Sequence, residues 1–80
     1  MGMLSFKEFQ ATRVARSLTP DEMDRRGLEP THSEVFEYDD RCFIFCREDG
    51  LYELLVGRSW RSMDLEFLER KLFTEWYYEG

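Results

Sequence analysis

The stretch EVFEYDDRCFIFCREDGLYELLVG, residues 34–57, decides the fold. Three runs rich in aromatic and aliphatic residues, 34–38, 41–47 and 51–57, are separated by aspartate and glycine turn signals, and we assign them a period of two, which predicts β-strands. Asp49-Gly50 predicts a tight hairpin, because a type I′ turn needs positive φ at both central residues. Asp39-Asp40 is a weaker turn signal and also permits a longer loop. We therefore expect a three-stranded antiparallel meander.

Side-chain alternation assigns the residues of these strands to two faces. If both turns have two residues, Phe43 lies opposite both Phe36 and Val56. Helices are then expected to cover the face with Phe36, Tyr38, Phe43, Phe45, Tyr52, Leu54 and Val56. The other face carries Val35, Glu37, Cys42, Ile44, Cys46, Glu53 and Leu55. A register shift of one residue would exchange these roles.

Helix signals lie on both sides of the strands. Ser5 and Glu8 have capping-box spacing and predict a first helix that runs to about Ser17 or Leu18. Thr19, Pro20 and Glu22 repeat the start signal for a short helix, and Gly27 is typical of its end.

After the strands, residues 57–62 (GRSWRS) are expected to form a turn, with Ser62 as the N-cap of the last helix. Leu65, Leu68, Leu72 and Trp76 recur at helical spacing in that helix. Residues 1–80 therefore predict one α+β domain of the order α-(short α)-β-β-β-α. Its architecture is a two-layer sandwich, in which the N- and C-terminal helices cover one face of the meander.

The charge of the chain disfavours nucleic acid as a ligand. The net charge is -6. The first twenty residues carry a balance of +2, so the remaining sixty carry -8. The α-β-β-β-α order is also that of double-stranded RNA-binding domains, which place cations at the start of the final helix. Here that start reads SMDLEFLE, residues 62–69, and its carboxylates would repel phosphate. Arginine outnumbers lysine by nine to two, which favours fixed or stacked contacts.

Nothing in the sequence indicates catalysis, a cofactor or a metal. His32 is the only histidine, and no phosphate-binding glycine loop or nucleophile motif is present. Cys42 and Cys46 lie ~13 Å apart along a strand, too far for a disulfide between them. We expect a non-enzymatic protein without cofactor or metal. No apolar run approaches the ~18 residues of a membrane span, and cytosol is the expected compartment.

Three groups of residues are candidates for partner binding. The acids Glu37, Asp39, Asp40 and Glu53 either serve solubility and turns or form an acidic surface for a basic partner. The first-helix stripe of Phe6, Phe9, Arg13 and Arg16 either packs internally, contacts a protein or stacks on single-stranded nucleic acid. The sheet strip of Val35, Cys42, Ile44, Cys46 and Leu55 is either a dimer or partner face or a modest exposed patch on a monomer.

Three segments carry a resemblance to known proteins: FKEFQATR (6–13), GLYELLVGRSW (50–60) and LEFLERKLFTEW (65–76). With them, most of the chain resembles small hypothetical proteins of bacterial phages, plasmids and other mobile elements. In size, acidity and compact α/β build it is also similar to anti-CRISPR proteins, the phage-encoded inhibitors of host defence. Neither resemblance assigns a role to a residue of this chain.

These observations predict a small acidic protein-binding module. The specific expectation is an inhibitor from a mobile element that binds a basic region of a host nucleic-acid-handling complex. The alternative is a structural or assembly protein that dimerises through its exposed sheet face.

Overall fold

The computed structural model describes residues 4–29, 33–47 and 49–75, without the side chain of Cys42. Within these ranges the chain forms α1 (Phe6–Ala11), β1 (Val14–Ser17), α2 (Pro20–Arg26), β2 (Glu34–Tyr38), β3 (Cys42–Cys46), β4 (Tyr52–Val56), β5 (Arg58–Ser62) and α3 (Leu65–Phe73). The strands make one antiparallel sheet in the order β1-β2-β3-β4-β5. The α+β class is confirmed, but the three-stranded meander is wrong, because two further strands extend it at its edges.

Strand β1 replaces the second half of the predicted first helix. The Ser5–Glu8 capping box is present, but α1 ends at Ala11. The Thr12 hydroxyl donates a hydrogen bond of 2.7 Å to the Phe9 carbonyl oxygen at the end of the helix. Val14–Ser17 then pair with β2, and these tertiary hydrogen bonds override the helical pattern of the sequence.

Strand β5 replaces the turn predicted over residues 57–62. Gly57 has φ 69°, and this left-handed backbone lets the chain reverse so that Arg58 pairs with Val56. The N-cap of α3 is Asp64, not Ser62, and the Asp64 carboxylate accepts from the Glu66 N–H at 3.1 Å.

Both hairpin loops have three residues, where two were predicted. Tyr38 pairs with Cys42, and both aspartates of the loop, Asp39 and Asp40, have positive φ. Aspartate tolerates this conformation better than most residues do. In the next hairpin, the Arg47 N–H donates a hydrogen bond of 3.0 Å to the Leu51 carbonyl oxygen. Residues 48–50 lie between these two residues and make up the loop.

The two longer loops turn β3 over while β2 and β4 keep their predicted orientation. Ile44 pairs with both Phe36 and Leu54 and therefore shares their face. Phe43 and Phe45 point to the opposite face. The assignment of these three β3 residues to faces is thus a correction, with the one-residue register shift as its cause.

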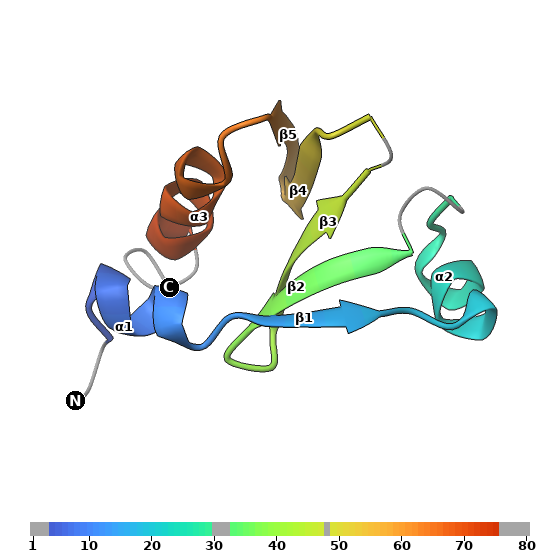
Figure 1. The fold of residues 1–80 in the computed structure, drawn as a ribbon, viewed down its shortest axis with the longest axis horizontal. Helices are drawn as coiled ribbons and strands as arrows, with labels where there is room; N and C mark the ends of the chain where they lie inside the picture. The colour runs from blue at the N-terminus through green and yellow to red at the C-terminus, as the bar shows by residue number, and fades with distance from the viewer. Residues whose placement is uncertain (1–3, 30–32, 48, 76–80) are drawn as a thin grey trace.

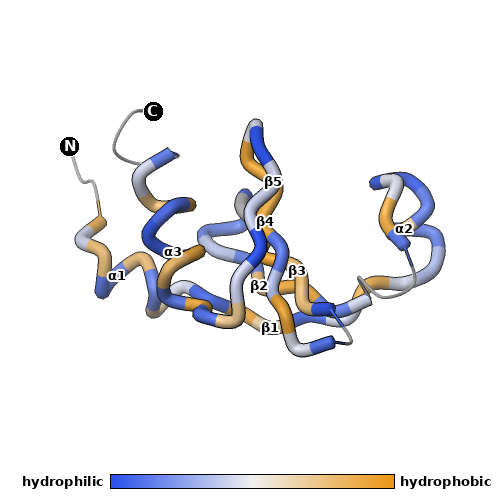
Figure 2. Tube along the Cα trace, turned by 90° about the horizontal axis from the view of Figure 1, so that it is seen from above, coloured by the Kyte–Doolittle hydropathy of each residue, from blue (hydrophilic) through white to orange (hydrophobic). Residues whose placement is uncertain are grey.

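The first face of the sheet carries the larger core. Its buried residues are Phe9, Tyr38, Ile44, Leu54, Leu68 and Leu72, from α1, the central strands and α3. Figures 1 and 2, in two perpendicular views, place α1 and α3 together at one end of the sheet and α2 at the other end.

The second face carries a smaller core under the α2 segment. Leu18, Val35 and Phe45 are buried there, and Met23 of α2 and Leu28 pack against them. The N- and C-terminal helices, α1 and α3, share the first face as predicted, but α2 packs on the second face, where no helix was expected. The candidate site lies on the part of this second face beyond Leu28, where Leu55 is half exposed among the described residues.

Candidate functional site

The ends of α2 determine how it meets the sheet. Thr19 and Glu22 form the predicted capping box, with Pro20 in the first turn. Gly27 ends the helix in the left-handed conformation at φ 68°. The chain then turns back, so that the Leu28 N–H donates to the Met23 carbonyl at 2.8 Å. Both apolar side chains thereby reach the second core.

Arg16 of β1 ties α2 to the sheet. Its Nη1 atom lies 3.0 Å from the Glu22 carboxylate of α2, and its Nε atom lies 3.0 Å from the Glu37 carboxylate of β2. The hydrogen bonds to Glu22 and Glu37 raise the pKa of Arg16. The Thr19 backbone N–H and Arg16 lower the pKa of Glu22. Arg16 and Glu22 are therefore charged at neutral pH, and the contacts of Arg16 with Glu22 and Glu37 hold α2 over the second face.

Beside α2 the second face contains an apolar hollow of about 140 Å³. Leu28, Phe43, Phe45, Leu55 and Val56 line it. The rings of Phe43 and Phe45 are parallel, with centroids 6.1 Å apart. Leu55 is 50% exposed, so part of this apolar lining faces solvent.

Two guanidinium groups complete the lining of the hollow. The Arg26 guanidinium lies 4.3 Å from the centroid of the Phe43 ring, a cation–π contact. Arg41 reaches the hollow from the β2–β3 loop. Among the residues that the structure describes, neither arginine has a carboxylate partner. We call this set, Arg26, Leu28, Arg41, Phe43, Phe45, Leu55 and Val56, the arginine-rimmed groove.

Glu53 precedes Leu54 in β4 and pairs with Phe45, so the two lie on the same face. Glu53 is only 6% exposed. Its carboxylate accepts from Arg47 at 3.3 Å, from Arg61 at 3.2 Å and from Ser59 at 3.2 Å. Buried carboxylates need such partners. Because Arg47 and Arg61 already bind Glu53, this carboxylate is not available to neutralise Arg26 or Arg41.

A second hollow, of about 180 Å³, lies where β1, β2 and β3 meet and includes Arg16 and Glu34 in its lining. Its arginine is already bound to Glu22 and Glu37. The arginine-rimmed groove is therefore the better candidate, because it combines exposed apolar surface with guanidinium groups that no described carboxylate binds.

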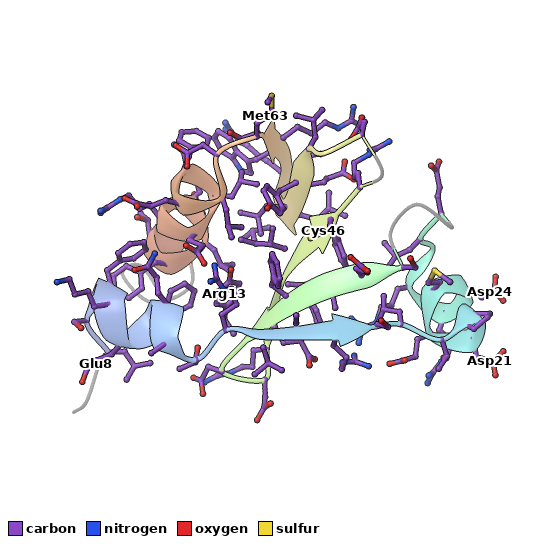
Figure 3. All side chains as sticks on the ribbon, in the orientation of Figure 1. Glu8, Arg13, Asp21, Asp24, Cys46 and Met63 are labelled. Carbon is purple, nitrogen blue, oxygen red and sulfur yellow. The ribbon has the colours of Figure 1, made fainter. Side chains whose placement is uncertain are left out.

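The predicted acidic surface is divided by the structure. Asp39 and Asp40 are exposed in the β2–β3 loop. Glu37 is bound to Arg16, and Glu53 is buried with Arg47 and Arg61. Asp21 and Asp24, which the prediction did not include, extend outward from α2 (Figure 3).

The predicted helix stripe does not exist as a stripe, because α1 ends before Arg13. Phe9 is buried, and the Phe6 ring packs edge-on against the Phe73 ring, with centroids 5.6 Å apart. The Arg13 guanidinium lies 3.0 Å from the Glu69 carboxylate, on the side of the sheet that α1 and α3 cover (Figure 3). Arg16 holds α2. These placements agree with internal packing and ion pairing, one of the three interpretations considered.

The predicted sheet strip does not form one exposed face. Val35 and Leu55 lie on the second face, with Val35 buried, whereas Ile44 lies buried in the first core. Cys46 is a half-buried free thiol whose pKa is raised by burial and by Glu34. Cys42 belongs to β3, and its side chain lies outside the described part of the structure. These residues therefore do not provide one exposed face for a dimer, and dimerisation itself stays a prediction.

Arg26, Leu28 and Arg41 were not predicted as site residues. The excess of arginine over lysine was the one sequence signal that pointed to them, since it favours stacked guanidinium groups such as Arg26 over Phe43. Which arginines would share a groove depended on the register of β3.

The described residues include no group of three or more histidine, cysteine or acidic side chains placed to hold a metal ion. Within the same ranges, every helix is too short or too polar to cross a membrane. No protein-family model, curated protein or solved structure matches the chain.

Proposed function

We propose that this chain is a small non-enzymatic protein-binding module and that the arginine-rimmed groove is its main contact surface. The observation that carries the proposal is the combination of half-exposed Leu55 with Arg26 and Arg41 around one hollow. Aromatic residues and arginine are the types enriched where binding energy concentrates in protein interfaces. A partner side chain in the hollow would bury more of the apolar surface of Leu55 and the two phenylalanines, which favours binding.

A second contact is part of the proposal. The net charge of -6 and the exposed aspartates of the β2–β3 loop, Asp39 and Asp40, support attraction to a partner with a basic region. In its finer form, the proposal makes the chain an inhibitor from a mobile element that acts in the host cytosol on a nucleic-acid-handling complex. Glu37 and Glu53 contribute less than expected to this attraction, because arginines of the same chain bind them.

The test begins with capture of a partner from bacterial lysate, its identification by mass spectrometry and its purification. Calorimetry then compares the affinity of the unchanged chain with that of Leu55→Asp and of Met63→Ser. Met63 is 79% exposed and lies at the turn between β5 and α3, away from α2 (Figure 3). We expect Leu55→Asp to weaken binding about tenfold or more and Met63→Ser to leave it unchanged.

The electrostatic contact is tested by the double change Asp39→Asn with Asp40→Asn, titrated against salt. We expect weaker binding and a shallower salt dependence than in the unchanged chain. Equal affinity of Leu55→Asp and the unchanged chain would exclude the groove as the contact surface, and an unchanged salt response would exclude the aspartates.

A further inference from the structure

We infer that the groove receives an extended segment of a partner protein in which one large apolar side chain is flanked on both sides by carboxylates. This inference rests on the proposed function and specifies the chemistry of the partner. It follows from the volume of the hollow, from the residues that line it and from the two arginines there that no carboxylate of the described residues binds.

The volume of the groove limits the apolar part of the ligand to one side chain. The hollow measures about 140 Å³. A buried cavity of ~150 Å³ takes up one benzene molecule, so the hollow is large enough for one aromatic ring or one branched aliphatic side chain. Its lining by Phe43, Phe45 and Leu55 offers such a group contacts on an apolar floor.

The rim determines the charge of the flanking residues. Arg26 lies with its guanidinium over the Phe43 ring. Arg41 contributes to the same lining from the β2–β3 loop. A guanidinium binds a carboxylate through two parallel hydrogen bonds, a geometry that lysine does not provide. Because α2 and the loop supply one arginine each, an anchored side chain with a carboxylate before and after it matches both.

The neighbouring carboxylates do not satisfy the two arginines. Glu22 and Glu37 bind Arg16, while Glu53 binds Arg47 and Arg61. These pairs leave Arg26 and Arg41 as cations without a described carboxylate in a protein of net charge -6.

The experiment uses the full chain, labelled with ¹⁵N, and a synthetic peptide of sequence GDDFDDG. Amide chemical shifts locate the site, and fluorescence anisotropy of the labelled peptide measures affinity. We expect shifts concentrated at Leu28, at Phe43 and Phe45 and at Leu55. Two changed peptides, GDDSDDG and GKKFKKG, are expected to bind at least about tenfold more weakly, because each lacks one of the two required features.

Arginine variants provide the matched comparison. We expect Arg41→Gln and Arg26→Gln each to weaken GDDFDDG binding about tenfold, the usual loss for a charge-assisted hydrogen bond. Arg25→Gln is the control, since Arg25 is exposed beside Arg26 but does not line the groove. If Arg25→Gln and Arg26→Gln lose the same affinity for the peptide, net charge alone explains the loss, and the inference is overturned.

Three other results would also overturn it: shifts confined to residues outside the groove, tighter binding of a short oligothymidylate, or self-association that Leu55→Asp abolishes. The first removes the site, and the others replace the partner segment by nucleic acid or by a second copy of the chain. If the purified partner depends on Leu55 but the peptide does not bind, the ligand class is wrong while the proposed function stands. If the peptide binds in the groove but the partner ignores Leu55→Asp, the proposed function fails instead.

Discussion

The Tyr38 hydroxyl donates a hydrogen bond of 2.7 Å to the Glu69 carboxylate, and both side chains are almost wholly buried. Gln10 donates to the other oxygen of Glu69 at 2.9 Å, and Arg13 reaches the same carboxylate at 3.0 Å. Glu69 therefore joins α3 to β2, to α1 and to the residue before β1. One carboxylate holds together segments that are far apart in the sequence.

Removal of the Tyr38 hydroxyl tests this network. Tyr38→Phe keeps the ring, which stacks on Phe9 with centroids 4.8 Å apart, and removes one donor from the buried carboxylate. We expect the free energy of unfolding to fall by about 1.5–3 kcal/mol, as for other hydrogen bonds to charged groups. Urea unfolding measures it. Tyr52→Phe is the control, with an expected change within ~0.5 kcal/mol, because no described group hydrogen-bonds to the Tyr52 hydroxyl.

The same contact predicts a loss of stability at alkaline pH. Burial, together with the hydrogen bond to Glu69 and the charge of Glu69, raises the pKa of Tyr38. Below pH ~10 the tyrosine is protonated in both the folded and the unfolded chain, so its contribution is constant. Above that pH the unfolded chain releases the proton first. The free energy of unfolding should then fall by up to about 1.4 kcal/mol per pH unit from this group.

Urea unfolding between pH 9 and pH 11 measures this slope. Tyr38→Phe removes the titrating group, so its profile should be flatter over the same range. Parallel profiles for the two proteins would show that other groups cause the alkaline loss.

Local signals in the sequence predicted the start of α1 and both ends of α2, but not the start of α3, whose N-cap is Asp64 and not Ser62. Both capping boxes, Ser5 with Glu8 and Thr19 with Glu22, form as expected, and Gly27 ends α2. These features depend on residues within one turn of each other, and the sequence contains everything that determines them. The far end of α1 depends instead on the pairing of β1 with β2, for which the sequence of residues 12–17 carries no comparable signal.

The register of β3 was predicted incorrectly, and this error is the reason why the sequence did not predict the groove. The β2–β3 loop has three residues, where two were predicted. This one-residue difference moves Ile44 to the first face of the sheet and moves Phe43 and Phe45 to the second face. The run CFIFC is apolar at every position, so its own pattern does not distinguish the two faces. The groove depends on that exchange, because Phe43 and Phe45 form its floor.

A pair of substitutions distinguishes the two registers. In the predicted register, Ile44 and Leu55 share one exposed face; in the structure, Ile44 is fully buried and Leu55 is half exposed. We expect Ile44→Ala to lower the free energy of unfolding by about 2–5 kcal/mol and Leu55→Ala by about 0.5 kcal/mol. If Ile44→Ala does not fold, Ile44→Val provides the measurement, with an expected loss of about 0.5–1.5 kcal/mol. Equal small losses at both positions would support the predicted register.

Gly57 tests the reversal that creates β5. An added Cβ at this position would meet no atom within 4 Å, so the cost of a side chain comes from the backbone alone. At φ 69°, alanine is disfavoured by about 1–2 kcal/mol, whereas asparagine tolerates this region better. We expect Gly57→Ala to destabilise the domain by that amount and Gly57→Asn by less, both measured by urea unfolding. A loss that is equal for alanine and asparagine would mean that the backbone conformation at residue 57 does not determine the turn. Because β5 pairs with β4 through Arg58 and Trp60, hydrogen exchange in Gly57→Ala should accelerate first in these two strands.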